Sequence, residues 1–241
     1  MDTRAGSPSP FAAFRLVAFD IDGTLIDSVD AHADAWQRAL AAYAIHPTYA
    51  DIRAQIGKGA DQLLPVFLSP EQIETFGAAV SDEHDAIFVA DHKPYLQAFP
   101  AVRELFEALR ADGKTLVLAS SGTRADVDFF KHVARIGDLV DLAVTSDDTE
   151  RSKPKPDILQ VALTRLASVP AHEAVMVGDS PWDAKSALRC GMRGIGLTCG
   201  GFPKDDLENA GCAAIFRDAA ELLRIHRSAL ADGLRPPTLQ C

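Results

Sequence analysis

Short apolar runs recur along the chain and alternate with longer amphipathic stretches. The runs have the length and the Val, Leu and Ile content of buried strands, and they span residues 16–19, 115–119, 142–145, 174–177, 194–197 and 214–216. Residues 102–111, 125–136 and 158–167 lie between them and carry apolar side chains at helical spacing. Such alternation is typical of a parallel sheet covered by helices on both faces. The pattern therefore predicts an α/β fold built on a parallel sheet.

One interval departs from this alternation. Between residues 29 and 94 no convincing strand pattern occurs, and segments such as DAHADAWQRALAAYA and SPEQIETFGAAVSDEHDAIFVA predict several helices separated by Pro and Gly. The interval is too long for a loop inside a compact domain. We therefore predict an inserted all-α subdomain at residues 29–94. The expected division of the chain is a disordered N-terminal tail at 1–14, a core at 15–28 and 95–226, the helical insertion at 29–94, and a C-terminal tail at 227–241.

Composition restricts the class of protein. A chain of 241 residues can form one large domain or one domain with an insertion, and a net charge of −10 argues against a nucleic-acid partner. No apolar run approaches the ~20 residues of a membrane span, and the polar, proline-rich N-terminus lacks a secretion pattern. The cysteines have no CxxC spacing, which favours reduced thiols in a cytoplasmic protein, and they are Cys190, Cys199, Cys212 and Cys241. The oligomeric state cannot be predicted from these features.

Two aspartates follow the first predicted strand directly. In the segment AFDIDGTLIDS, Asp20 and Asp22 flank a single isoleucine at the end of the apolar run 16–19. Two carboxylates this close repel each other, and the end of a buried strand offers little water to solvate them. We therefore expect a cation beside them.

Further polar segments follow other predicted strands. SSGT occupies residues 120–123, SKPKPD residues 152–157 and GDSPWD residues 178–183. Taken singly, each segment could be only a turn, a helix cap or an extended linker. Because the carboxyl ends of parallel strands meet at one edge of the sheet, we expect them to converge with Asp20 and Asp22. Carboxylate oxygens suit Mg²⁺, while a lysine and small hydroxyls would hold a phosphoryl group that an aspartate could attack.

These segments together resemble the haloacid dehalogenase superfamily, in particular the capped branch that contains phosphoglycolate phosphatases and β-phosphoglucomutases. The resemblance covers residues 16 to 223, and DIDGTLIDS matches the first motif of that family in full. It implies a Rossmann-like parallel sheet core with an inserted all-α cap. It also implies that Asp20 is the nucleophile and that Asp22 is the general acid and then the general base. The remaining implied roles are phosphate binding by Gly23, Ser120, Ser121 and Lys153, magnesium binding by Asp20, Asp22 and Asp179, and support of the metal's water shell by Asp183.

The resemblance also separates reaction types. Members of the family that remove halide generally lack an aspartate two residues after the nucleophile, whereas this chain has Asp22 there. A Mg²⁺-dependent phosphatase that forms an aspartyl-phosphate is therefore expected. One alternative is a mutase, since His32 and Trp36 resemble residues of β-phosphoglucomutase; however, Ala60 stands where such mutases carry an arginine. A non-catalytic binding protein on the same fold is the other alternative.

The predicted cap contains the features that bear on the substrate. Residues 56–64, IGKGADQLL, resemble a glycine-rich specificity loop, so Gly57, Lys58 and Gly59 are expected to contact substrate together with His32. A catalytic cap lysine, as in phosphonate-cleaving relatives, is a less favoured role for Lys58. The cap has few basic residues against about ten acidic ones, which favours a small phosphorylated metabolite over a polyanionic substrate. These basic residues are Arg38, Arg53, Lys58 and Lys93.

Overall fold

A six-stranded parallel sheet forms the centre of the molecule. The computed structural model describes residues 8–232 of the chain. The strands are β1 (Leu16–Phe19), β2 (Thr115–Ala119), β3 (Leu142–Val144), β4 (Ala174–Gly178), β5 (Arg193–Leu197) and β6 (Cys212–Phe216). Their order is β3-β2-β1-β4-β5-β6, and every neighbouring pair is parallel. The predicted α/β fold is therefore confirmed.

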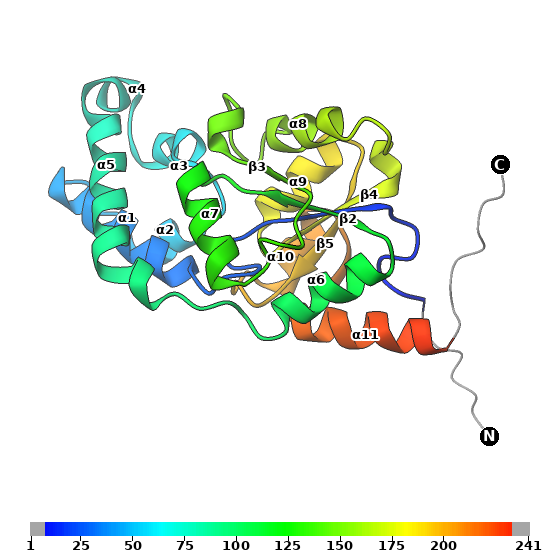
Figure 1. Ribbon diagram of the computed structural model, residues 1–241. Helices are drawn as coiled ribbons and strands as arrows, with labels where there is room; N and C mark the ends of the chain where they lie inside the picture. Colours follow the sequence, from blue (N-terminus) through cyan, green and yellow to red (C-terminus); the bar gives the residue numbers. More distant parts are fainter. Residues whose placement is uncertain (1–7, 233–241) are drawn as a thin grey trace.

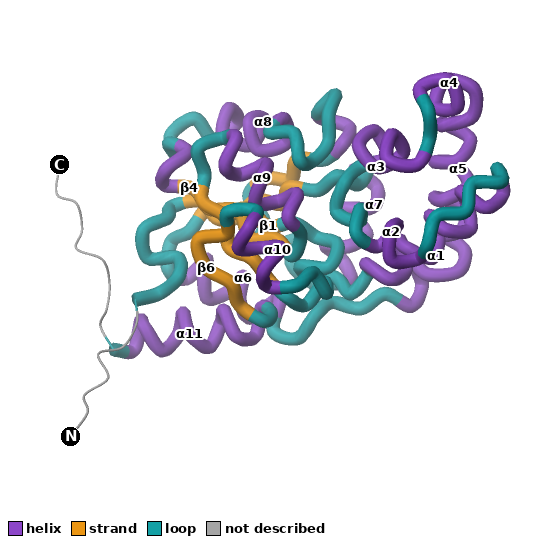
Figure 2. The backbone as a smooth tube through the Cα atoms, turned by 180° about the vertical axis from the view of Figure 1, so that it is seen from behind, coloured by secondary structure: helices purple, strands orange, loops and turns teal. Residues whose placement is uncertain are grey.

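Helices cover both faces of this sheet. They are α6 (Val102–Ala111), α7 (Arg124–Val133), α8 (Asp157–Arg165), α9 (Pro181–Arg189), α10 (Lys204–Asn209) and α11 (Ala219–Ala231), with short 3₁₀ turns at Ser146–Asp148 and Ala171–Glu173. Val17 and Phe19 of β1 pack in one cluster with apolar residues of α6, α7 and α11, whereas Leu16 and Ala18 pack in another with residues of α8 and α9. Successive side chains thus alternate between two buried faces, which explains the continuous apolar runs in the sequence. Figure 2 shows α8 and α11 on opposite sides of the strands.

A second group of helices lies between β1 and α6 in the sequence. This group, here called the cap helices, comprises α1 (Val29–Ala42), α2 (Tyr49–Arg53), α3 (Ala60–Phe67), α4 (Pro70–Gln72), α5 (Ala78–Ile87), the π-turns Ile73–Gly77 and Phe88–His92, and the 3₁₀ turn Lys93–Tyr95. It packs around its own apolar cluster, in which Trp36, Leu40, Ile52 and Leu63 are buried. Figure 1 shows α1 to α5 grouped at one end of the molecule, beside the sheet. The exact limits proposed for the inserted subdomain stay a prediction.

The two chain segments that connect the cap helices to the sheet run side by side. Ile26 and Ala98 form an antiparallel bridge. On one side of this bridge, the backbone N–H of Asp27 donates to the carbonyl of Gln97 at 2.9 Å. On the other side, the N–H of Phe99 donates to the carbonyl of Leu25 at 2.9 Å. The chain therefore enters and leaves the cap at a single place.

The predicted tails are both too long. Residues 8–14 belong to the packed structure, because Phe11 and Phe14 are buried in the main cluster and Ser9 Oγ lies 2.7 Å from Nδ1 of His226. At the other end α11 continues to Ala231 and buries Ala229, beyond the expected start of the tail at residue 227. The rest of both predicted tails, residues 1–7 and 233–241, lies outside the described residues.

Two further expectations concern thiols and membranes. Cys190, Cys199 and Cys212 are free thiols, as expected, while Cys241 lies outside the described residues. Among residues 8–232, none of the helices combines the length and the apolar character needed to cross a membrane.

Candidate active site

The order of the strands brings three polar segments to one point. β1 lies between β2 and β4, so the strand order continues in opposite directions from the two sides of β1. Ligands of parallel sheets bind at such a switch point. Asp20 follows β1, Ser120 follows β2 and Asp179 follows β4. The backbone N–H of Asp20 donates to the carbonyl of Val177 at 2.9 Å, which continues the ladder one residue past β1. The convergence predicted from the strand ends is therefore present.

Three buried carboxylates form an acidic triad at this point. Asp20, Asp179 and Asp183 each place one carboxylate oxygen within 4.8 Å of the others, and each residue is at most 2% exposed. Burial, together with the neighbouring acids, raises the pKa of Asp20 to about 8 and that of Asp179 well above its usual value. Oδ2 of Asp20 is buried and has no hydrogen-bond partner among the described residues. An all-oxygen, negatively charged set with an unsatisfied atom fits a hard divalent cation.

Lys153 compensates part of this charge. Its side chain is fully buried, and its Nζ contacts Oδ1 of Asp20 directly and lies 2.8 Å from Oδ1 of Asp183. Burial by itself would lower the pKa of Lys153, but Asp183 and Asp20 outweigh it and raise the pKa above the usual value. Lys153 is therefore an ammonium ion, and one positive charge faces three carboxyl groups. The second oxygen of Asp183 accepts hydrogen bonds from the N–H of Ser180 at 3.2 Å and from its hydroxyl at 2.6 Å, which caps α9.

Asp22 lies apart from the triad. Its Oδ1 accepts a hydrogen bond from Ser28 Oγ at 2.6 Å and lies 3.1 Å from Nε2 of His32 on α1. Burial would raise the pKa of Asp22, but the contacts with His32 and Ser28 outweigh it and lower the pKa overall. The predicted metal set of Asp20, Asp22 and Asp179 and the supporting role of Asp183 stay predictions; among the described residues, the carboxyl groups of Asp20, Asp179 and Asp183 are the ones that lie together.

A cavity of about 580 Å³ lies above the acidic triad, between the sheet edge and the cap helices. The predicted site residues that line it are Asp20, Asp22, His32, Gly57, Lys58, Gly59 and Ser121. The other predicted site residues do not line it and are buried below its surface, namely Gly23, Ser120, Lys153, Asp179 and Asp183. Ser120 Oγ accepts a hydrogen bond from the N–H of Gly122 at 3.0 Å, so it stabilises the turn after β2. Of the two predicted serines, only Ser121 faces the cavity.

Gly57 and Gly59 allow the cap to approach loops of the core. A Cβ atom on Gly57 would lie 2.8 Å from Ser180 Oγ, and one on Gly59 would lie 2.2 Å from Ser152 Oγ. Gly57 also has a φ of 94°, in the left-handed region that favours glycine. The two glycines therefore serve a close contact between polypeptide segments, in addition to lining the cavity.

Lys58, between these glycines, turns toward the rim of the cavity. Its Nζ donates to Oε1 of Gln55 at 2.5 Å and lies 4.1 Å from the centre of the Trp182 ring. Burial and the nearby charge of Lys185 lower the pKa of Lys58. The residue links the cap to α9 and lines the cavity.

Sequence reasoning missed two residues that hold Asp179. Thr24 is fully buried and donates its hydroxyl to Oδ1 of Asp179 at 3.0 Å. Gly200, after β5, lies so close that a Cβ atom there would be 1.8 Å from Oδ2 of Asp179. Arg53 of the cap donates to the carbonyl of Gly200 at 3.0 Å. The Gly-Gly pair after a predicted strand was an available signal for a close approach; Thr24 was hidden inside the DGT turn.

Comparisons with known proteins agree with this architecture. A family model described as haloacid dehalogenase-like hydrolase matches residues 14–191. A phosphoglycolate phosphatase of Vibrio vulnificus is 31% identical over 193 residues, which cover 77% of this chain and 84% of that protein. Pyrophosphatase PpaX of Bacillus velezensis is 29% identical over 188 residues, covering 75% of this chain and 82% of its own length. A crystal structure of a hydrolase from Pseudomonas syringae shares 29% identity and a TM-score of 0.80, over 89% of this chain and 98% of that one.

Proposed function

Because the chain belongs to the haloacid dehalogenase-like hydrolases, we propose that it is a Mg²⁺-dependent phosphatase that hydrolyses a small phosphate monoester through an aspartyl-phosphate on Asp20. The observation that carries this proposal is the position of Asp20. It is the one member of the acidic triad that also lines the cavity, and it contacts the buried ammonium of Lys153. Lys153 lowers the pKa of Asp20 against the effect of burial, and Mg²⁺ when bound would lower it further; an ionised carboxylate beside such cations suits attack on a phosphoryl group.

The residues of the site divide the reaction between them. A carboxylate oxygen of Asp20 attacks phosphorus, the bond from phosphorus to the leaving oxygen breaks, and Asp22 donates a proton to that oxygen. Asp22 then takes a proton from water as the water attacks the aspartyl-phosphate, which releases phosphate and restores Asp20. Lys153 offsets the charge of Asp20 throughout. Mg²⁺ would be held by Asp20, Asp179 and Asp183, and it would supply positive charge to the phosphoryl oxygens.

The phosphoryl group is also bound by the turn after β2 in this proposal. Ser121 lines the cavity next to Gly122 and Thr123, so its hydroxyl can reach a phosphoryl oxygen. Ser120 has a supporting role because it holds the N–H of Gly122. Gly23 also has a supporting role, because it leaves room for Asp179: a Cβ atom on Gly23 would lie 2.3 Å from Oδ2 of Asp179.

The substrate is a small phosphorylated metabolite whose leaving group contacts the cap residues His32 and Lys58. Relatives of similar identity are named as phosphatases of phosphoglycolate and of pyrophosphate, so the names do not single out one leaving group. Ala60 lines the cavity where a mutase would carry an arginine, and no arginine occurs in the cavity lining of the described residues. Hydrolysis is therefore favoured over a mutase reaction. A cytoplasmic location and the absence of a nucleic-acid partner stay predictions.

Hydrolysis of 4-nitrophenyl phosphate tests this proposal. The full chain is assayed with Mg²⁺ and after chelation by EDTA, beside Asp20→Asn and the control Asp27→Asn. Asp27 is exposed and follows the same strand, so Asp27→Asn removes the same charge as Asp20→Asn without altering the triad. Removal of Mg²⁺ and the Asp20→Asn change should each lower turnover by about 10³-fold or more, because each removes a group required for the covalent step. Turnover that survives both changes would exclude the proposed mechanism.

A further inference from the structure

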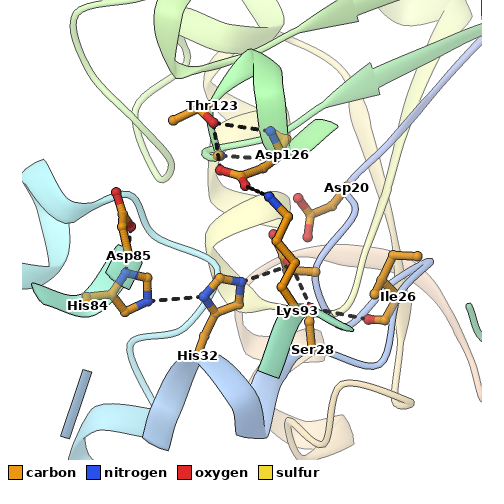
Figure 3. A network of polar contacts seen from close by, with 12 residues as sticks. Asp20, Ile26, Ser28, His32, His84, Asp85, Lys93, Thr123 and Asp126 are labelled. Atoms are coloured by element: carbon orange, nitrogen blue, oxygen red, sulfur yellow. Dashed lines mark hydrogen bonds and ion pairs between the residues drawn. The ribbon is translucent and has the colours of Figure 1, made fainter. Parts of the chain in front are cut away.

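Two imidazole rings connect Asp22 to a carboxylate on the cap. Nε2 of His32 lies 3.1 Å from Oδ1 of Asp22, and Nδ1 of His32 lies 3.2 Å from Nε2 of His84. Nδ1 of His84 in turn lies 2.9 Å from Oδ1 of Asp85. Figure 3 shows the ring of His84 between Asp85 and His32. We refer to Asp22, His32, His84 and Asp85 as the histidine network.

The positions of hydrogen in this network follow from its chemistry. An ionised carboxylate only accepts hydrogen bonds, so Nδ1 of His84 must carry a hydrogen toward Asp85. A neutral imidazole has one N–H, which leaves Nε2 of His84 as an acceptor for a hydrogen on Nδ1 of His32. Burial lowers the pKa of His84, which keeps that ring neutral. With its Nδ1 directed at His84, the ring of His32 presents Nε2 to Asp22.

Stacking holds both rings in this orientation. The indole of Trp36 lies parallel to His84, with ring centres 4.1 Å apart and planes 19° from parallel. Phe88 stacks on His32 at 4.0 Å and 10°. His84 is only 6% exposed. The stacks fix the planes of both rings, and a ring that turned over within its plane would break its hydrogen bonds, so the arrangement is fixed by packing together with polar contacts.

We propose that His84 and Asp85 are positioning residues for the acid–base step: they hold His32 with a hydrogen on Nδ1 and with Nε2 directed at Asp22. This inference rests on the proposed function of Asp22. A ring fixed in this way fixes in turn the carboxyl group of Asp22, which lines the cavity where the leaving oxygen must lie.

The arrangement also joins the two parts of the molecule in function. Asp22 follows a strand of the sheet, whereas His32, His84 and Asp85 belong to cap helices α1 and α5. Asp22 is therefore held by the histidine network only while the cap helices stay in contact with the sheet edge.

A kinetic comparison separates positioning from general stabilisation. His84→Phe keeps an aromatic ring against Trp36 but has no nitrogen, so His32 loses its partner at Nδ1 and Asp22 is no longer held in place. Under single-turnover conditions, the first step with an alkyl phosphate should slow about 10- to 100-fold, part of the usual value of acid–base catalysis, while the first step with 4-nitrophenyl phosphate should change less than about threefold. Asp85→Asn should show the same preference more weakly, and the exposed Asp82→Asn on the same helix should show none. Equal losses on both phosphates, or no loss on the alkyl phosphate, would overturn the proposal.

A second measurement does not depend on turnover. The ¹⁵N chemical shifts of the imidazole nitrogens in the full-length protein at neutral pH report which of them carry hydrogen. We expect hydrogen on Nδ1 of both His84 and His32, and a change at His84 in Asp85→Asn. A bare Nδ1 on His32 would overturn the inference even if the protein is a phosphatase. Conversely, the expected shifts in a protein without phosphatase activity would support the network and contradict the proposed function.

Discussion

A Cβ atom on Gly200 would lie 1.8 Å from Oδ2 of Asp179, so the loop after β5 presses its backbone against a carboxylate of the acidic triad. Gly200→Ala should therefore displace Asp179. Overpacking of this kind costs about 1–3 kcal/mol, and where the metal-bound form bears that cost, Mg²⁺ affinity should fall about 5- to 150-fold. The Mg²⁺ concentration needed for half-maximal hydrolysis measures this effect. Gly137→Ala is the control because nothing lies within 4 Å of its Cβ position; equal behaviour of the two variants would refute the role of Gly200.

Removal of the buried ammonium should destabilise the fold as well as the reaction. Lys153→Met leaves Asp20 and Asp183 without their shared cation, and breaking a buried pair in this way costs about 3–5 kcal/mol. Urea unfolding gives the free energy. The double variant Lys153→Met with Asp183→Asn should recover part of the loss because it removes one of the stranded charges. A stability unchanged by Lys153→Met would contradict the charge balance described for the triad.

The role of Asp22 can be read from the leaving group. The asparagine of Asp22→Asn cannot donate the proton, so turnover of an alkyl phosphate should fall about 10²- to 10⁴-fold, which is the usual contribution of general acid–base catalysis. 4-Nitrophenyl phosphate should lose much less in the first step, because nitrophenolate leaves without protonation. Rapid-quench measurements under single-turnover conditions isolate that step. The same loss for both leaving groups would rule out a general-acid role.

The cap lysine should affect the choice of substrate. Lys58→Ala removes a charge at the rim of the cavity and should change the ranking among phosphate esters, while the Mg²⁺ dependence stays as in the wild type. Lys185→Ala is a matched control because its Nζ also lies over the Trp182 ring, at 4.7 Å, without lining the cavity. Kinetics on two unlike esters check the ranking. A uniform loss with altered Mg²⁺ dependence would place Lys58 in the core site.

Acid should weaken the anchoring of the N-terminal segment. Burial lowers the pKa of His226, which contacts Ser9, so the folded protein binds fewer protons there than the unfolded chain. Stability from this residue is present above the unfolded pKa of about 6.5 and is lost as the pH falls toward the lower folded value. The melting temperature of the wild type should therefore fall more between neutral and mildly acidic pH than that of His226→Gln. Parallel pH profiles would contradict this explanation.

The sheet was predictable because its strands are buried on both faces. Each predicted apolar run overlaps an observed strand, and the run 115–119 coincides with β2. The tails were not predictable from local pattern. The polar, proline-rich N-terminus suggested disorder, yet Phe11 is buried in the main cluster, in edge-to-face contact with His226 from the far end of the chain. A local pattern holds no information about such a distant partner.

The site was predictable to the level of strand ends, but not of side-chain direction. Asp20 and Asp179 meet because their strands are neighbours of the same sheet. The carboxyl group of Asp22 turns toward Ser28 and His32 on the cap side, while Asp183 reaches the triad from the first turn of α9. Those choices depend on how the cap helices lie against the sheet, which spacing along the sequence does not encode.

The paired segments at Ile26 and Ala98 have a consequence for how such proteins can diversify. Because the chain departs and returns at adjacent positions, the helices between them can be lengthened, shortened or exchanged without altering any strand connection. Closing a longer loop at this place costs little more than closing a short one, since the entropy penalty grows only with the logarithm of length. Evolution can thus remodel the cap helices while the strand order and the acidic triad beneath them stay the same.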